Sequence, residues 1–242
     1  MLNVVVIAED HSDAEIVCGL ADRIFEELGS VTFENLPSYR NWIGFDPNTS
    51  FIKKSHISVL FDRLKASSKR PRFLGYVKGE PKGSYTAFWR KAVELVVAMG
   101  KSQLITGVLI HCDVDGKPEQ RKDIEQACGH WLRSVLAMPN REMEAWLLNG
   151  FDAQNSSEQK RFAESKRNLA FDPCKDAHRA QDTSGERDPK NIIKALTDGD
   201  EDRKRSCWLK TDLSTLRQRG EETNLAHFLR DIEANFLPLL SG

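Results

Sequence analysis

The chain has 242 residues, of which 40% are hydrophobic and 29% are charged. This composition is typical of a globular protein with a sizeable core, and it excludes a disordered or fibrous chain. Lysine and arginine total 35 against 36 acidic residues, so the formal net charge of −1 provides no general attraction for polyanions. A site for a polyanion would therefore need local clusters of charge or a bound metal ion.

The cellular location of the protein and the redox state of its cysteines can be predicted from motifs that the sequence lacks. The first apolar run breaks at Glu9, which leaves no secretion signal, and no apolar run approaches the roughly 18 residues of a membrane helix. We therefore expect a soluble, cytoplasmic protein with no membrane partner. The five cysteines are widely spaced and include no C-x-x-C pair, so we expect reduced and mostly buried thiols rather than zinc ligands.

Strand and helix patterns begin to alternate at the start of the chain. A β-branched run over 2–8 predicts a strand that is covered on both faces. Apolar residues at spacings of three and four then predict a helix over about 13–28, which Ser12 or Asp13 would cap. We expect a second strand over 31–36 and a loop insertion over about 37–54.

The alternation continues to residue 150. The expected elements are a weak helix at 56–64, a short strand at 73–77, a helix at 85–99, an apolar strand at 107–112, a helix at 118–133, a strand at 135–138, and a helix capped by Asn140 that runs to Gly150. Alternating strands and helices are the signature of an α/β fold with a mainly parallel sheet.

Beyond residue 150 the composition becomes polar and charged, and no strand pattern follows Met138. Short helices are expected at about 157–168, 189–197, 202–218 and 222–236. We therefore expect a core domain over residues 1–150 and a mainly helical C-terminal extension over 151–242.

Two of the expected strands end in acidic residues. Glu9 follows the first strand with Asp13 four residues later, and Asp113 and Asp115 follow the apolar strand at 107–112. In an extended chain Asp113 and Asp115 would lie on the same side. Because the carboxyl ends of parallel strands meet at one edge of a sheet, we expect all four acids to converge there. Such an oxygen-only cluster favours Mg²⁺ or Mn²⁺, since clustered carboxylates repel one another unless a positive charge compensates.

The order of these motifs resembles the Toprim fold of topoisomerases, primases and overcoming-lysogenization-defect (OLD) nucleases. The segment 141–148, Arg-Glu-Met-Glu-Ala-Trp-Leu-Leu, is similar to the one that follows the Asp-x-Asp strand in stand-alone Toprim-like proteins of bacterial defence loci, of the DUF4276 and DUF4435 type. The resemblance covers about residues 1–150. It implies a Toprim-like, mainly parallel sheet with helices on both faces, followed by the helical extension.

The resemblance also implies roles for the acids. Glu9 corresponds to the glutamate that acts as general acid–base or metal ligand, and Asp13 to a supporting ligand. Asp113 and Asp115 correspond to the metal-binding aspartate pair. One departure is Asp10, which stands where the family usually has a glycine after the first glutamate.

Residues further along the chain complete the implied site. Glu144 corresponds to a later glutamate that completes a second metal site. Glu142 is the alternative ligand, because two residues that are two positions apart on a helix cannot face the same point. Lys190 and Lys210 resemble C-terminal lysines that neutralise the charge developing on a phosphate.

The implied activity is hydrolysis of phosphodiester bonds in DNA or RNA by two Mg²⁺ or Mn²⁺ ions about 4 Å apart. The implied setting is bacterial anti-phage defence, with an ABC-type or OLD-like ATPase as the controlling partner. The resemblance is also compatible with assembly of the chain into a homo-oligomer. The chain contains no Walker-type phosphate loop, so any nucleotide hydrolysis would belong to the partner.

Two alternatives remain. A Toprim-like scaffold without catalysis would serve as a binding or regulatory module for an ATPase. The stretch Asp113-Val114-Asp115-Gly116 is also similar to the motif of haloacid-dehalogenase-like phosphohydrolases, in which the first aspartate is a nucleophile. In those enzymes the motif lies on the first strand and threonine follows the glycine, whereas here the motif is in mid-chain and Lys117 follows.

Overall fold

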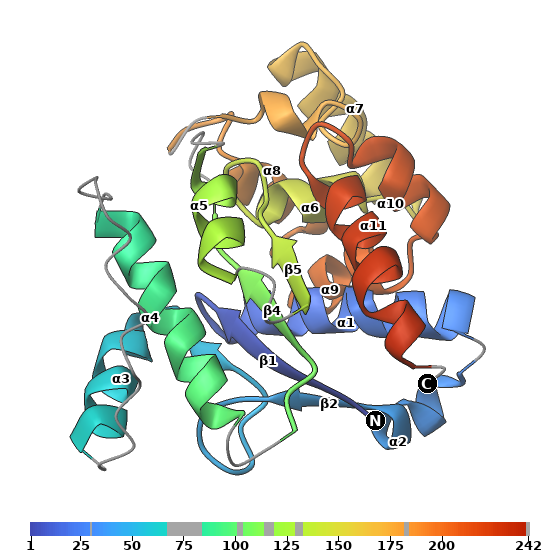
Figure 1. Ribbon diagram of the computed structural model, residues 1–242. Helices are drawn as coiled ribbons and strands as arrows, with labels where there is room; N and C mark the ends of the chain where they lie inside the picture. Colours follow the sequence, from blue (N-terminus) through green and yellow to red (C-terminus); the bar gives the residue numbers. More distant parts are fainter. Residues whose placement is uncertain are drawn as a thin grey trace.

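The computed structural model describes residues 1–29, 31–66, 84–100, 104–113, 119–128, 133–181 and 184–240. Within these ranges, five strands form one parallel sheet, and helices pack around it (Figure 1). The expectation of an α/β fold with a parallel sheet and a helical C-terminal part is confirmed.

The first strand lies inside the sheet. On one side β1 (Leu2–Ala8) pairs with β4 (Gly107–His111), which in turn pairs with β5 (Arg133–Ala137). On its other side β1 pairs first with β2 (Arg40–Ile43) and then with the two-residue strand β3 (Ile52–Lys53). The chain therefore leaves β1 in one direction and later returns to its other side, so the strand order reverses between β1 and β4.

Alternate side chains of β1 enter two separate hydrophobic clusters. Leu2, Val4 and Val6 pack against one helical layer, in which α1 and the C-terminal helices lie. That layer consists of α1 (His11–Gly29), α6 (Glu144–Asn149), α8 (Pro189–Thr197), α9 (Glu201–Leu209), α10 (Leu213–Arg219) and α11 (Leu225–Asn235), and α7 (Ser156–Leu169) packs on α8. Most of the C-terminal region therefore helps to cover this face of the sheet.

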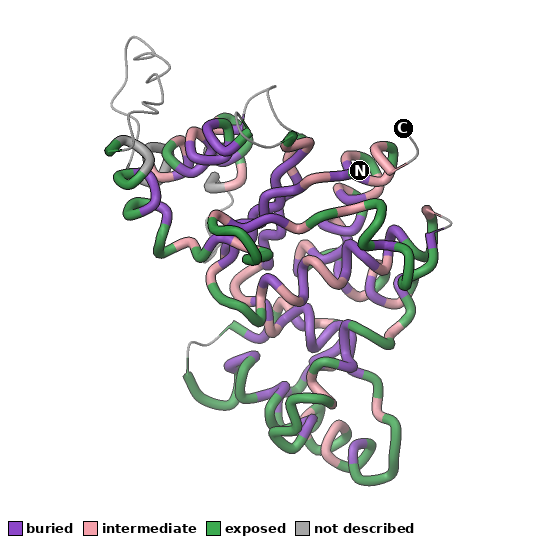
Figure 2. Tube along the Cα trace, turned by 90° about the horizontal axis from the view of Figure 1, so that it is seen from below, coloured by how far each residue is buried: buried purple, intermediate pink, exposed green. Residues whose placement is uncertain are grey.

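The opposite face is covered by the middle of the chain. Val5 and Ile7 of β1 belong to a second cluster with residues from α3 (Ile57–Ala66), α4 (Ser84–Met99) and α5 (Glu119–Cys128). The central strands β1 and β4 are buried on both faces and lie between the two helical layers (Figure 2). This burial agrees with the continuous apolar runs from which the strands were predicted.

The expected strand over 31–36 is wrong. That stretch contains the 3₁₀ helix η1 (Phe33–Asn35), which leads into the short helix α2 (Leu36–Tyr39). The backbone N–H groups of Asn35 and Leu36 both donate to the carbonyl of Thr32, and a proline in the first turn of α2 favours the helical turn. The second strand instead forms within the stretch expected to be a loop insertion, which contains β2 and β3.

Two helix boundaries also differ from expectation. The helix expected from Asn140 begins only at Glu144, because Arg141 has φ = 78° and the Asn140 side chain donates to the carbonyl of Glu222. The helix expected over 202–218 is split into α9 and α10. The Arg23 guanidinium of α1 binds the carbonyls of Trp208 and Thr211 at this break, which satisfies groups that a helix end leaves open.

The expected strand at 73–77 lies outside the described residues. In the ranges that are described, no helix is both long enough and apolar enough to cross a membrane.

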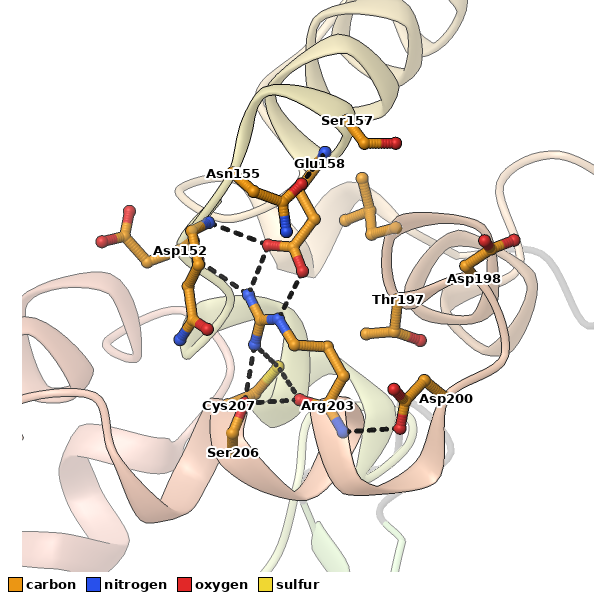
Figure 3. A network of polar contacts seen from close by, with 12 residues as sticks. Asp152, Asn155, Ser157, Glu158, Thr197, Asp198, Asp200, Arg203, Ser206 and Cys207 are labelled. Carbon is orange, nitrogen blue, oxygen red and sulfur yellow. Dashed lines mark hydrogen bonds and ion pairs between the residues drawn. The ribbon is translucent and has the colours of Figure 1, made fainter.

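A buried ion pair fixes α9 to α7. The Arg203 guanidinium donates to both carboxylate oxygens of Glu158, at 2.8 and 3.0 Å, and to the carbonyl of Asp152 at 2.7 Å (Figure 3). The same guanidinium donates to the Ser206 hydroxyl and lies 4.7 Å from the ring centroid of Phe151. The hydrogen bond from Arg203 lowers the pKa of Glu158. Charged groups are therefore buried here with their hydrogen-bonding capacity well used.

Candidate carboxylate site at the sheet edge

The carboxyl ends of β1 and β4 lie next to each other where the strand order reverses. Glu9 follows β1, and Asp113 follows β4 after one intervening residue. In open α/β sheets ligands bind at such a reversal, beyond the carboxyl ends of the strands. The structure thus brings two of the predicted acids to the expected edge, although about a hundred residues separate them in sequence.

Asp10 organises the start of α1. Its carboxylate accepts a hydrogen bond from the backbone N–H of Asp13 at 3.0 Å and another from the Ser12 hydroxyl at 2.8 Å. Burial acts to raise the pKa of Asp10, but these hydrogen bonds outweigh it and lower that pKa. The acid that departs from the Toprim pattern therefore caps the helix, which places Asp13 in its first turn.

His111 lies between two of the predicted acids. It is the last residue of β4, and its side chain is only 1% exposed. Its Nδ1 lies 3.6 Å from Asp13 Oδ2, and its Nε2 lies 3.5 Å from Asp113 Oδ1. Asp13 and Asp113 therefore converge from α1 and from the end of β4 onto the same buried imidazole.

The electrostatics show how close the acids are. Burial raises the pKa of Asp13 to about 6; His111 acts in the opposite direction. The charges of Asp10, Asp113 and Glu9 add to the rise. Three neighbouring carboxylates thus add to the effect of burial in disfavouring the ionisation of Asp13, as expected for like charges held together.

Glu9 is held by a lysine that the sequence did not single out. Lys54 Nζ lies 2.6 Å from Glu9 Oε1 and 6.0 Å from the ring centroid of Trp89. Lys54 begins the 3₁₀ helix η2 (Lys54–His56), directly after β3. Because β3 pairs with the last two residues of β1, it delivers Lys54 beside Glu9. Only the pairing of so short a strand reveals this contact, and a two-residue strand leaves no periodic signal in the sequence.

The start of α6 contributes two more acids: Glu144 is its first residue, and Glu142, just before it, contacts Lys190. Lys190 Nζ lies 3.4 Å from Glu142 Oε1, and burial raises the pKa of Glu144. Burial acts to lower the pKa of Lys190, but the charges of Glu144 and Glu142 outweigh it and raise that pKa. Asp113 adds to the same effect, so Lys190 lies within electrostatic reach of the end of β4. The structure therefore places Lys190 beside Glu142 and near Glu144, and its role in catalysis stays a prediction.

Lys210 is placed differently. It is an exposed residue at the C-cap of α9, and no contact recorded for the described residues joins it to a carboxylate of the site. Lys204, one turn and a half earlier on α9, instead interacts with Glu144. The expectation for Lys210 thus gains no support from the geometry.

The donor chemistry of this edge fits a hard divalent cation, although the ligands are not gathered around one point. Asp113 Oδ1 and Glu142 Oε2 are buried without a hydrogen-bond partner. Carboxylate oxygens are the ligands that Mg²⁺ and Mn²⁺ take. Within the described part of the chain, no group of three or more His, Cys, Asp or Glu side chains is placed to hold a metal ion. Asp115, the remaining predicted ligand, lies outside that part.

Neither family models, nor curated proteins, nor solved structures match this chain. The Toprim resemblance therefore stays a prediction from sequence motifs, and the functional conclusions below depend on the geometry of the carboxylate site.

Proposed function

We propose that this protein is a phosphodiesterase that depends on Mg²⁺ or Mn²⁺ and cleaves DNA or RNA. One observation carries the proposal: Asp13 and Asp113, from distant parts of the sequence, converge on buried His111 at the reversal of strand order. In a purely structural cluster the buried carboxylate oxygens would have hydrogen-bond partners. Here Asp113 keeps a buried oxygen without a hydrogen bond, and Asp13 has a raised pKa.

The chain's own residues have separate tasks in this proposal. Glu9, Asp13 and Asp113 would hold the cations, and Glu144 or Glu142 would contribute to a second ion. Bound Mg²⁺ or Mn²⁺ supplies activation of water and stabilisation of the leaving oxygen.

Two lysines frame these acids and need no metal for their roles. Lys190, near Glu142 and Glu144, would offset the negative charge of the phosphate. Lys54 keeps Glu9 oriented at the end of β1 by their 2.6 Å contact.

The proposed setting is an effector of anti-phage defence that an ABC-type ATPase controls. This part of the proposal is supported by the motif resemblance alone, because the geometry of one chain contains no partner.

One alternative has an observation in its favour. His111 and Lys54 already contact three of the acids, and the described residues contain no ready-made metal group. In a catalytically silent regulatory module with the same fold, these contacts with His111 and Lys54 would be the only partners that the acids need, and no metal ion would bind.

Calorimetric titration of the protein with Mn²⁺, together with cleavage assays on single- and double-stranded DNA and RNA, tests the proposal. We expect Asp113→Asn to abolish carboxylate-dependent Mn²⁺ binding and to reduce the rate of cleavage by more than about a hundredfold. Mutation of residues that only hydrogen-bond to metal ligands already reduces metal affinity or activity by about 10–100-fold, and Asp113 would be a ligand itself. Asp62→Asn, which changes an exposed acid of α3, is the matched control and should leave both unchanged.

The outcomes separate the alternatives. Mn²⁺ binding and cleavage that persist in Asp113→Asn would contradict the proposal. Absence of Mn²⁺ binding and of cleavage in the unaltered protein would favour the silent module. Hydrolysis of phosphate monoesters with a phosphorylated Asp113 would instead indicate a haloacid-dehalogenase-like phosphohydrolase.

A further inference from the structure

A cavity of about 220 Å³ opens beside the carboxylate site. Its walls come from the first turns of α1, from α6 with the residue before it, and from α9. Asp13 and Glu144 line it, so the cavity shares these two acids with the candidate metal site. A molecule in this cavity would therefore lie next to any phosphate held at the sheet edge.

The inner wall of the cavity is apolar. Ile16, Met143, Leu147 and Trp208 line it, and each of them is at least nine-tenths buried. Trp208 packs so closely on α1 that a Cβ at Gly19 would lie 2.3 Å from its ring. The Arg203–Glu158 pair ties α9, the helix of Trp208, to α7 (Figure 3). The apolar wall is therefore preformed, as ligand pockets usually are.

The rim of the cavity carries more acids than bases. Glu15 forms an ion pair with Arg205, and Glu201 lies 3.8 Å from Lys204. After these pairs are taken into account, Asp13, Glu144 and Asp202 remain on the lining as negative groups. Such a rim repels phosphate and accepts hydrogen bonds from N–H groups.

We propose that this cavity binds a nucleobase with an exocyclic amino group, adjacent to the phosphodiester at the carboxylate site. The proposal deepens the proposed function and rests on it, since it names the part of a nucleic acid that the cavity would hold. The accessible part of the apolar wall can contact the flat base, and carboxylates on the rim accept its amino hydrogens. The volume lies below the roughly 300 Å³ at which pockets for drug-sized ligands begin, which suits one base rather than a larger ligand.

Cytidine and uridine make a sharp pair of probes, because the C4 amino donor of cytidine is a carbonyl acceptor in uridine, while the N3 acceptor of cytidine is an N–H donor in uridine. We expect the metal-free protein to bind cytidine about tenfold more tightly than uridine in an NMR titration, since a hydrogen bond to a charged acceptor is worth at least that factor. Glu201→Gln combined with Asp202→Asn changes two exposed rim acids and should reduce this preference. No metal and no cleavage are needed for this measurement, so it is independent of whether the protein hydrolyses phosphodiesters.

A second pair of variants tests the location. Ser12 is exposed and lines the cavity, so Ser12→Trp should fill the opening and abolish cytidine binding. Ser214→Trp places the same side chain at an exposed position of α10, away from the cavity lining, and should leave binding unchanged. Thermal unfolding of both variants checks that each remains folded.

Equal affinity for cytidine and uridine would overturn the proposal, and so would cytidine binding that survives in folded Ser12→Trp. Binding of putrescine without binding of cytidine would assign the cavity to amines and would overturn it as well. If cytidine binds as expected but no nucleic acid is cleaved, the cavity assignment stands while the proposed hydrolysis fails.

Discussion

Two clusters of charged side chains in this protein are built in opposite ways. In the first, Glu158 is buried and the Arg203 side chain is only 10% exposed, and the guanidinium binds both oxygens of the carboxylate. In the second, Asp13 and Asp113 surround one buried histidine, and neither aspartate forms an ion pair with a lysine or arginine in the described ranges. Opposite charges are matched in the first cluster, and like charges are concentrated in the second.

The contrast distinguishes groups that stabilise the fold from groups that are available for chemistry. A matched and hydrogen-bonded pair needs nothing further, so the Arg203–Glu158 cluster is complete in the protein alone. A concentration of carboxylates raises the free energy of the folded state unless a cation joins it. The second cluster is therefore the one that would gain most from a ligand.

The largest expected effect is on the matched cluster. Arg203→Ala would leave Glu158 buried without its partner, so we expect a loss of about 3–5 kcal/mol in the free energy of unfolding, measured by urea denaturation at pH 7. The hydrogen bond from Arg203 lowers the pKa of Glu158, so the stabilisation exists above the unfolded pKa and is lost as pH falls. The difference between Arg203→Ala and the unaltered protein should accordingly shrink in acid.

Arg230→Ala is the matched control for this measurement. Arg230 pairs with Glu221 on the surface, where both side chains are more than half exposed. Its loss should change the free energy of unfolding by less than about 1 kcal/mol. Equal effects of the two arginine substitutions would contradict the distinction between a buried and an exposed pair.

The carboxylate cluster should have the opposite effect on the pH dependence of the free energy of unfolding. Since the pKa of Asp13 is raised to about 6 by burial, the folded state keeps a proton that the unfolded chain releases near pH 4. The free energy of unfolding should therefore fall as pH rises from about 4 to about 6. In metal-free protein at pH 7 we expect Asp13→Asn to stabilise the fold by about 1–2 kcal/mol. This is less than the free energy that corresponds to the whole pKa shift of Asp13, because its side chain is partly exposed to solvent.

Denaturation curves at pH 4 and pH 7 test this expectation, with Asp62→Asn on α3 as the control for loss of one negative charge. Destabilisation by Asp13→Asn at pH 7, or a gain of the same size in the control, would show that the cluster is not under electrostatic strain.

The smallest expected effect concerns the two C-terminal lysines. Lys190 lies 3.4 Å from Glu142, whereas Lys210 is exposed at the end of α9. Because the Lys190 side chain is 57% exposed, we expect Lys190→Met to reduce the rate of Mn²⁺-dependent cleavage by only about fivefold, or about 1 kcal/mol. Lys210→Met should leave the rate unchanged, and a larger effect at Lys210 would reverse the assignment.

The fold was largely predictable from the sequence because buried parallel strands and amphipathic helices leave strong periodic patterns. The runs that form most of β1 and β4 and the second half of β5 are apolar. β2 and β3 were missed because Arg40–Ile43 is short and half polar, and Ile52–Lys53 has only two residues. Their positions depend on pairing with β1, which no local pattern contains.

The candidate site was predictable to a smaller extent. The acids after β1 and β4 were identified because each follows an apolar strand. The contacts that define their chemistry come from tertiary structure, namely Lys54 beside Glu9 and the position of His111 between two aspartates. Lys190 could be distinguished from Lys210 only when the packing of α8 and α9 against α6 was known.

The position of β1 inside the sheet has a consequence for folding during synthesis. Its neighbour β4 begins at Gly107, and β5 beyond it is covered by α11, which ends at Asn235. β1 can pair early with β2 and β3, but its pairing with β4 must wait until roughly a hundred further residues have been made, and pairings of such long range form slowly. The carboxylate edge needs both β1 and β4, so it should assemble only after β4 has been made.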